Sequence, residues 1–289
     1  MINIDIFDYF PINVRVELEK YINFNNYKTL EEIRIRTNRP IVLKFNNEQK
    51  ILDYIIQTKD ILNIMQFLTE NSLYSYQKQI CDGFITLKGG HRVGISGNVV
   101  MEQGKVINMN YIYSLNFRIS KQIIGVSNRI FEIIYNKGEV NNTLIVSSPG
   151  AGKTTMLRDL VRNLSKYKTV GIVDERGEIA AMYKNIPQND LGLQVDIMNN
   201  VTKSVGIKML IRSMSPDIIC ADEIGTKEDI EAIKYAFTSG VNGIFTAHSD
   251  SLDNLSKNPI LNELLSEKII KKLIILDKND RNNAKCIDF

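Results

Sequence analysis

One short segment limits what this chain can fold into more than any other. An apolar run at residues 144–146 predicts a strand. The sequence SSPGAGKTT at residues 147–155 follows it, and then the helix-like stretch MLRDLVRNL. This segment matches the phosphate-loop pattern G-x-x-x-x-G-K-[ST], except that Ser147 stands at the first glycine. A strand, a glycine-rich loop and a helix in this order predict a nucleotide-binding α/β domain.

The residue types in this loop suit a polyphosphate. Gly150 and Gly152 let the backbone curl, so that successive N–H groups point at phosphate oxygens next to a helix N-terminus. We expect Lys153 to reach the β- and γ-phosphates, the Thr154 hydroxyl to ligate Mg²⁺, and Thr155 to contact the α-phosphate. The predicted ligands are therefore ATP and Mg²⁺. The predicted nucleotide-binding residues are Ser148, Pro149, Gly150, Ala151, Gly152, Lys153, Thr154 and Thr155.

A second motif follows further along the chain. Residues 217–224 read DIICADEI, an apolar strand that ends in two carboxylates. This is the Walker B arrangement that accompanies a phosphate loop. We expect Asp222 to hold Mg²⁺ through its water shell, and Glu223 to act as the general base on the attacking water.

Between these motifs, the apolar run at residues 170–173 ends in DERGE. The carboxyl ends of strands line the ligand crevice of an open parallel sheet. Asp174 or Glu175 would then help to position water or coordinate metal indirectly. A structural salt bridge of these carboxylates with Arg176 is an equally good interpretation, and the sequence leaves both open.

Three more residues are candidates because of their positions near strands. The run at residues 243–247 brings Thr246 and His248 to a strand end, where we expect them to face the γ-phosphate. Arg212 lies just before the Walker B strand, in MLIRSMSPD, and is predicted to contact phosphate or a neighbouring subunit.

The pattern of apolar residues divides the chain into two domains. Residues 1–125 predict a smaller α/β domain, with strands at 30–35 and 41–45, a helix at 61–69 and a hairpin around Gly89 and Gly90. Residues 126–289 predict an open α/β sheet of the RecA-like P-loop ATPase type. Its strands, at 144–146, 170–173, 218–221, 243–246 and 273–276, are continuous apolar runs, which suit a parallel sheet covered on both faces.

Composition limits the environment and the partners. The net charge of +3 is too small to indicate a nucleic-acid partner by itself, since such footprints need clustered basic residues. The three cysteines are far apart and form no metal-binding pair. No stretch is apolar over the roughly 18 residues that a spanning helix needs. We therefore expect a cytoplasmic protein that reaches membranes only through partners.

Several longer strings resemble one known family. SSPGAGKTTMLRD, VDERGEIA, IRSMSPDIICADEIG and FTAHSDS, together with EEIRIRTNRP, GGHRVGISG and SLNFRIS, are similar to the stage III sporulation protein AA family. That family lies in the secretion-ATPase branch of the RecA-like P-loop proteins, and the similarity extends over nearly the whole chain. It implies an ATPase in the mother cell of a spore-forming bacterium. Such a protein would work as a ring, expected to be a hexamer, on membrane-embedded channel proteins that lead to the forespore.

The resemblance also implies roles for particular residues. Asp174 and Glu175 fall on the Asp box of secretion ATPases, and His248 falls on their His box. In that branch N-terminal arginines complete the nucleotide site. The first candidates here are Arg118 and Arg129, followed by Arg34, Arg36 and Arg92. Two positions depart from the pattern of the branch: Ser147 for glycine, and Asp222 beside Glu223 where Gly-Glu is common.

Two other functions remain open from the sequence. The same ATPase core drives nucleic-acid translocases, although no concentrated basic and aromatic run is present. A small-molecule kinase would need an acceptor pocket and usually a basic lid, and no arginine-rich lid segment is found. Stimulation of ATP hydrolysis by DNA or RNA would indicate the first, and phosphorylation of an acceptor the second.

Overall fold

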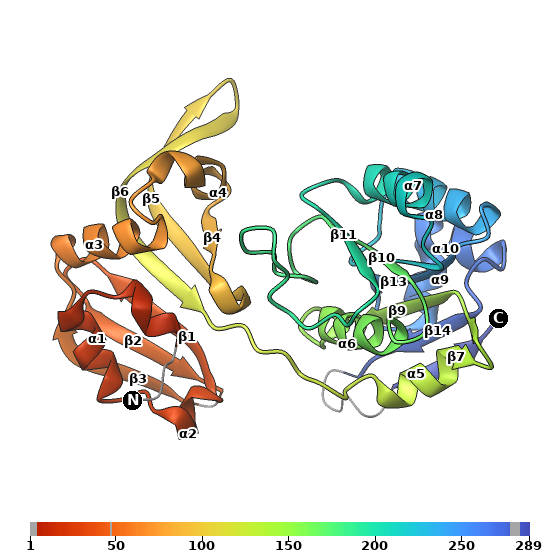
Figure 1. Cartoon of the computed structure of the whole chain (residues 1–289), viewed down its shortest axis with the longest axis horizontal. Helices are drawn as coiled ribbons and strands as arrows, with labels where there is room; N and C mark the ends of the chain where they lie inside the picture. The colour runs from red at the N-terminus through yellow and green to blue at the C-terminus, as the bar shows by residue number, and fades with distance from the viewer. Residues whose placement is uncertain (1–4, 47, 278–283) are drawn as a thin grey trace. The chain divides into compact units, whose positions relative to one another are not determined.

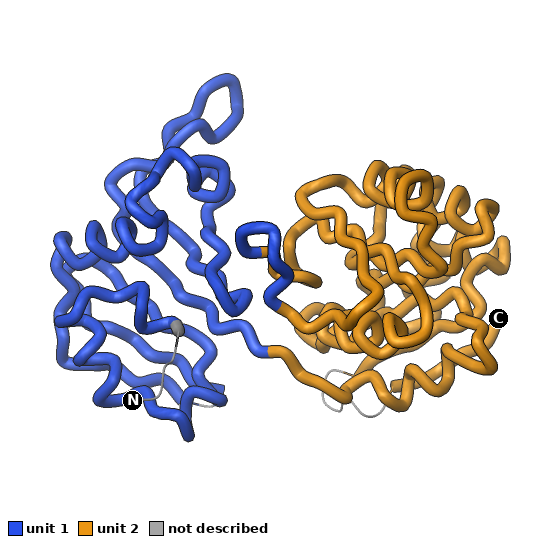
Figure 2. The backbone as a smooth tube through the Cα atoms, viewed as in Figure 1, with its two compact units in different colours: residues 1–121, 183–188 blue, residues 122–182, 189–289 orange. Residues whose placement is uncertain are grey.

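The structure, a computed structural model, describes residues 5–46, 48–277 and 284–289. Figure 2 shows the chain divided into two compact units. Unit 1 comprises residues 1–121 and 183–188, and unit 2 comprises residues 122–182 and 189–289. The predicted domain boundary lay after residue 125. The structure places the division four residues earlier and assigns residues 183–188 to the first unit.

Unit 1 is built on a six-stranded antiparallel sheet with the strand order β3-β2-β1-β6-β5-β4. One face packs against α1 and α3, whose apolar side chains, such as Leu18 and Ile64, join those of the strands in one core. The predicted strands at 30–35 and 41–45, the helix at 61–69 and the hairpin near Gly89 are present as β1, β2, α3 and the β4–β5 pair. The elements of unit 1 are η1 (Asp5–Tyr9), α1 (Ile12–Glu19), α2 (Phe24–Tyr27), β1 (Leu30–Arg36), β2 (Pro40–Phe45), β3 (Gln49–Ile55), α3 (Thr58–Leu68), η2 (Leu73–Tyr76), α4 (Gln77–Cys81), β4 (Phe84–Thr86), η3 (Lys88–Gly90), β5 (Arg92–Glu102) and β6 (Lys105–Arg118).

Unit 2 has a seven-stranded sheet in the order β11-β10-β12-β13-β9-β14-β15, parallel except for the last pair. Successive residues of β9 alternate between two cores. Leu144 and Val146 pack with α7, α8, α9 and α10, whereas Ile145 packs with α5 and α6. Figure 1 shows these two helix layers on opposite faces of the sheet. The continuous apolar runs therefore arise because both faces are buried, as predicted.

The strands predicted for unit 2 are all present, and two edge strands were not predicted. β11 carries a partly exposed side chain at every position, and β15 is a short edge strand, so neither has the continuous apolar run by which the others were found. The elements of unit 2 are α5 (Asn128–Ile134), β7 (Tyr135–Asn136), β8 (Glu139–Val140), β9 (Thr143–Ser147), α6 (Lys153–Leu164), β10 (Val170–Asp174), β11 (Val195–Asn199), α7 (Lys203–Met214), β12 (Ile218–Ala221), α8 (Lys227–Thr238), β13 (Asn242–His248), α9 (Leu252–Lys257), α10 (Pro259–Ser266), β14 (Lys272–Ile275) and β15 (Lys285–Asp288). Across the described ranges, no helix is both long and apolar enough to cross a bilayer.

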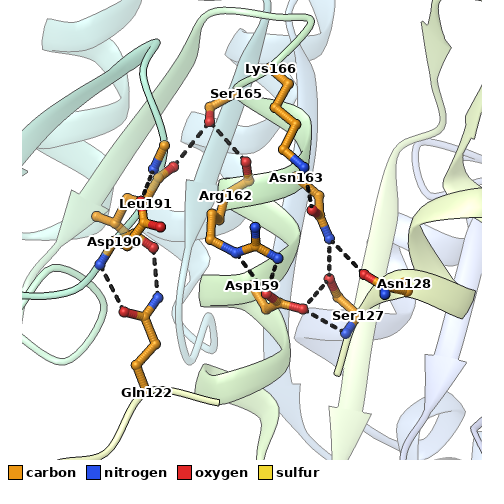
Figure 3. Close-up of polar contacts among 11 residues, drawn as sticks. Gln122, Ser127, Asn128, Asp159, Arg162, Asn163, Ser165, Lys166, Asp190 and Leu191 are labelled. Atoms are coloured by element: carbon orange, nitrogen blue, oxygen red, sulfur yellow. Dashed lines mark hydrogen bonds and ion pairs between the residues drawn. The ribbon is translucent and has the colours of Figure 1, made fainter. Parts of the chain in front are cut away.

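A buried polar network ties the first residues of unit 2 to α6 (Figure 3). The Asp159 carboxylate accepts hydrogen bonds from the backbone N–H of Ser127 at 2.8 Å and from its hydroxyl at 2.7 Å. On its other side it accepts from the Arg162 guanidinium, also at 2.7 Å. Gln122 and Asp190 join the two neighbouring chain segments through a pair of amide hydrogen bonds. The helix that begins at the phosphate loop is thus fixed to the start of its own unit.

Asp159→Asn is expected to lower the free energy of unfolding of unit 2 by about 2–4 kcal/mol, since it leaves the nearly buried Arg162 without its carboxylate. Burial by itself would raise the pKa of Asp159, but the Ser127 hydrogen bonds and Arg162 outweigh it and hold that pKa below its ordinary value. A lowered carboxyl pKa gives stability that is complete above the unfolded value of about 3.9 and is lost as the pH falls through the folded value. The difference between wild type and variant should therefore shrink below about pH 4.

Hydrogen exchange of the α6 backbone amides in the full-length chain, followed by mass spectrometry at several urea concentrations, measures this difference. Glu231→Gln is the matched control, because it removes one carboxylate charge from an exposed position of α8. It should change the stability by no more than about 0.5 kcal/mol. Equal effects of the two substitutions would contradict the assigned role of Asp159.

Candidate active site

The phosphate loop joins β9 to α6 at the carboxyl edge of the parallel sheet. Gly150 and Gly152 have φ angles of 78° and 98°, a region that favours glycine. Gly152 is the residue before α6, and the helix begins at Lys153. The first N–H groups of a helix lack partners within it, so they are available for an anion in front of the loop.

Asp222 and Thr154 meet in front of this loop. The Thr154 hydroxyl donates to Oδ2 of Asp222 at 2.5 Å. The Thr246 hydroxyl donates to Oδ1 of the same carboxylate. The first turn of α6 and the ends of β12 and β13 are therefore held together at one point. Thr246, predicted to face the γ-phosphate, is fully buried, and its hydroxyl contacts both members of the acidic pair.

Glu223 has a backbone conformation that is rare outside glycine, with φ of 54°. Its N–H donates to the Thr246 hydroxyl at 2.8 Å, and the next N–H, of Ile224, donates to the Thr246 carbonyl at 2.8 Å. A bulky residue in this region is held only where its surroundings fix it, and such positions cluster at functional sites. The strain turns the Glu223 side chain out of the sheet, where it contacts His248 and Arg176.

His248 links Glu223 to the loop lysine. The Lys153 ammonium lies 3.1 Å from Nδ1 of His248 and donates to the Ser147 carbonyl at 3.2 Å. Because an ammonium has no acceptor, Nδ1 must accept, and Nε2 then carries the hydrogen that faces Oε1 of Glu223 at 3.1 Å. Burial lowers the pKa of Lys153, while the nearby Asp222 and Glu223 carboxylates act to raise it. An anion bound next to Lys153 would offset the cost of burying the positive charge of its ammonium.

The residues after β10 separate into different roles. Asp174 is buried, and its two oxygens accept from the backbone N–H groups of Glu178, Ile179 and Ala180 at 2.8–3.1 Å. This arrangement makes Asp174 an anchor for the following loop. Glu175 forms an ion pair with Lys203. Arg176 forms an ion pair with Glu223, which lies far from it in sequence.

Of the predicted Asp174–Glu175 pair, Asp174 therefore binds backbone groups, whereas the Glu175 carboxylate pairs with a side chain. A small hollow at this edge of the sheet is lined by Val173, Asp174, Glu175, Arg176, Glu178, Lys203, Asp222 and Glu223.

The remaining predicted arginines lie elsewhere. Arg212 stands in the last turn of α7, 5.9 Å from the centre of the Tyr235 ring on α8. That end of α7 leads into the amino end of β12, at the sheet edge opposite the phosphate loop. Unit 2 does not bring Arg212 to its own phosphate loop, which leaves contact with a neighbouring subunit as its predicted role. Arg118 is the exposed last residue of β6 in unit 1, and Arg129 is exposed on α5 of unit 2.

The hard oxygen ligands present suit Mg²⁺. This ion is usually held by one or two carboxylates together with substrate phosphates, rather than by a cage of protein ligands. Thr154 and Asp222 match that donor set, and their oxygens already lie within 2.5 Å of each other. In the part of the chain that is described, no group of three or more His, Cys, Asp or Glu residues could hold a metal by itself. Thr154 and Asp222 would hold Mg²⁺, which supplies charge neutralisation to the β- and γ-phosphates.

Both the sequence and the fold of this chain are similar to those of known proteins. The family model described as sporulation stage III, protein AA matches residues 5–286. Stage III sporulation protein AA of Bacillus subtilis (strain 168) is 38% identical over 256 residues, which cover 86% of this chain and 83% of the relative.

Solved structures share the fold at low sequence identity. The ATPase DotB of Legionella pneumophila superposes with a TM-score of 0.59 at 16% identity, covering 92% of this chain and 76% of that protein. The pilus retraction motor PilT, solved with ADP, gives 0.61 at 13% identity, covering 91% and 77%. These similarities show that the chain shares the fold of these two proteins, consistent with the RecA-like α/β core that the sequence predicted.

Proposed function

The chain belongs to the sporulation stage III protein AA family, and on that premise we propose that it is a Mg²⁺-dependent ATPase. It binds ATP at the phosphate loop and hydrolyses it. The energy drives membrane-embedded channel proteins between mother cell and forespore. The protein acts from the mother-cell cytoplasm as a homo-oligomer, expected to be a hexamer.

One observation carries the catalytic part of this proposal. Thr154 of the phosphate-loop helix and Asp222 of the acidic strand end are in hydrogen-bond contact although they are far apart in sequence. A phosphate-loop hydroxyl beside a Walker B carboxylate is the pairing that holds Mg²⁺ on the β- and γ-phosphates. Lys153 and Glu223 lie on either side of His248 in the same group. A phosphate-binding cation and a general base are thus available at one sheet edge.

The assignment of work on a channel rests on the family and on the shared fold. DotB is described as an ATPase and PilT as a pilus retraction motor, and both are similar to this chain in fold. Motors of this kind turn over ATP without a phosphate acceptor. A ring would also let an arginine of one subunit, such as Arg212 or Arg118, complete the site of its neighbour.

The purified full-length chain should release free phosphate from ATP in the presence of Mg²⁺, and chelation with EDTA should abolish that release. Light scattering should detect a larger assembly with ATP than without it, because the arginines named above would act between subunits. Phosphate release that is unaffected by EDTA would contradict the Mg²⁺ site, and a monomer under both conditions would contradict the ring. Turnover that rises on addition of single-stranded DNA or RNA would favour a nucleic-acid translocase instead.

A further inference from the structure

We propose that Arg176 is a positioning residue with two alternative partners. In the absence of a γ-phosphate it pairs with Glu223, and when a γ-phosphate is present it moves to that phosphate. The inference rests on the proposed function, because it concerns how the same site distinguishes ATP from ADP.

The order of contacts along the sheet edge is the first argument. Strands β10, β12, β13 and β9 are consecutive neighbours in the sheet. The side chains that follow them form one continuous series in the same order. Arg176 contacts Glu223, Glu223 contacts His248, and His248 contacts Lys153 of the phosphate loop. Lys153 and Arg176 are therefore the two cationic ends of a single series, with Glu223 between them.

The backbone around Arg176 is held by hydrogen bonds, whereas the Arg176 side chain is exposed to solvent. Asp174 binds the backbone N–H groups of Glu178, Ile179 and Ala180, and the N–H of Gly177 contacts the Asp174 carbonyl at 3.3 Å. The Arg176 side chain, in contrast, is 66% exposed. A change of partner at this position needs only side-chain rotation, so it can occur without refolding of the loop.

The relative strengths of the two pairings give the direction of the switch. An ion pair with one largely exposed member stabilises by little, because water and salt screen it. A guanidinium binds the planar oxygen pairs of phosphate through two parallel hydrogen bonds, which are charge-assisted and stronger. A γ-phosphate within reach would therefore take Arg176 from Glu223.

The neighbouring cation, Lys203, is less able to exchange its ion-pair partner. Lys203 lines the same hollow, but it pairs with Glu175 and its side chain is only 12% exposed. A largely buried ion pair is costly to open, since it leaves an uncompensated charge. Arg176 is thus the cation of this hollow that can exchange partners at low cost.

The exchange has a consequence for Glu223. While Arg176 is paired with Oε2 and His248 faces Oε1, both carboxylate oxygens have a partner. Departure of Arg176 leaves Oε2 able to accept a hydrogen bond from water, which is the geometry that a general base requires. The base is then available only when the γ-phosphate is bound, and ADP leaves the Arg176–Glu223 pair in place.

Arg176→Gln is expected to weaken binding of the non-hydrolysable ATP analogue with a β,γ-imido bridge by about tenfold, while binding of ADP changes by less than about twofold. Isothermal titration calorimetry of the full-length chain with Mg²⁺ measures both affinities. Arg176→Lys should give an intermediate loss for the analogue, because an ammonium restores the charge without the two parallel hydrogen bonds.

Lys227→Gln is the matched control, since it removes an exposed cation from the start of α8, which follows β12 at the same sheet edge. It should leave both affinities within about twofold. Equal weakening of ADP and analogue by Arg176→Gln, or no change in either, would overturn the inference. A wild-type chain that binds neither nucleotide would overturn the proposed function as well, so the two failures are distinguishable.

Discussion

Lys153→Ala is expected to lower the affinity for both ATP and ADP by about a hundredfold or more, because the buried phosphates lose the cation that compensates them. Lys153 is 5% exposed, and its ammonium contacts Ser147 and His248 at the base of the loop. Desolvation lowers the pKa of Lys153, so burial disfavours the charge on its ammonium. A bound polyphosphate offsets the cost of burying the Lys153 ammonium, and alanine has no charge with which to attract the phosphates. Calorimetric titration with each nucleotide measures the loss.

Lys257→Ala provides the control for charge alone, since Lys257 is exposed in the last turn of α9. Its nucleotide affinities should remain within about twofold of wild type. Circular dichroism of Lys153→Ala should match that of wild type, which separates lost binding from lost folding. Wild-type affinity in a folded Lys153→Ala protein would remove the phosphate loop as the nucleotide site, and with it the proposed function.

The phosphate loop and the acidic strand end could be predicted because their signals are local. Each is a strand followed directly by the residues that carry the chemistry, so the strand end positions them. The structure adds that Thr154 and Asp222 are in contact. Neither motif alone predicts this contact, although the two motifs together imply it. The family is also as predicted. The α/β fold could be predicted because alternate residues of a strand, such as Leu144 and Ile145, are buried on opposite faces of one sheet, which gives a continuous apolar run in the sequence.

The pairing of Arg176 with Glu223 could not be predicted, because the sequence suggested only the carboxylates beside Arg176 as its partners. Asp174 and Glu175 precede Arg176 directly, yet Asp174 binds backbone groups and Glu175 binds Lys203. Arg176 pairs instead across the sheet edge with Glu223, at the end of the strand beside β10. Only the strand order brings these two residues together, and a sequence pattern does not give strand order.

Residues 183–188 show the same limit at the level of domains. They follow β10 in sequence, yet Tyr183 and Lys184 bind Glu70 of unit 1, at 2.8 Å and 2.7 Å. The N–H of Gly89 also donates to the Gln188 side chain at 2.7 Å. A division of the sequence at a single boundary could not assign this segment to unit 1, because its hydrogen-bond partners lie about a hundred residues earlier in the chain.

Glu223→Gln is expected to reduce the rate of ATP hydrolysis by about 10²–10⁴-fold, the range typical for loss of a general base, while ATP affinity stays within about threefold. The amide has nearly the shape of the carboxylate, so it can keep the contact with His248, but it cannot accept a proton from water. The variant should therefore retain bound ATP. Single-turnover phosphate release, measured beside calorimetric ATP binding, separates the two effects.

Glu228→Gln and Glu175→Gln serve as the comparison variants for that measurement. Glu228 is exposed in the first turn of α8, so its substitution should leave the rate within about twofold of wild type. Glu175 lines the same hollow as Glu223, and the sequence predicted that it could help to position water. If Glu175→Gln lost the hydrolysis rate while Glu223→Gln kept it, the general base would be Glu175. The strained backbone of Glu223, with its N–H held by Thr246, favours the opposite result, because it directs this carboxylate toward His248, next to Lys153 of the phosphate loop.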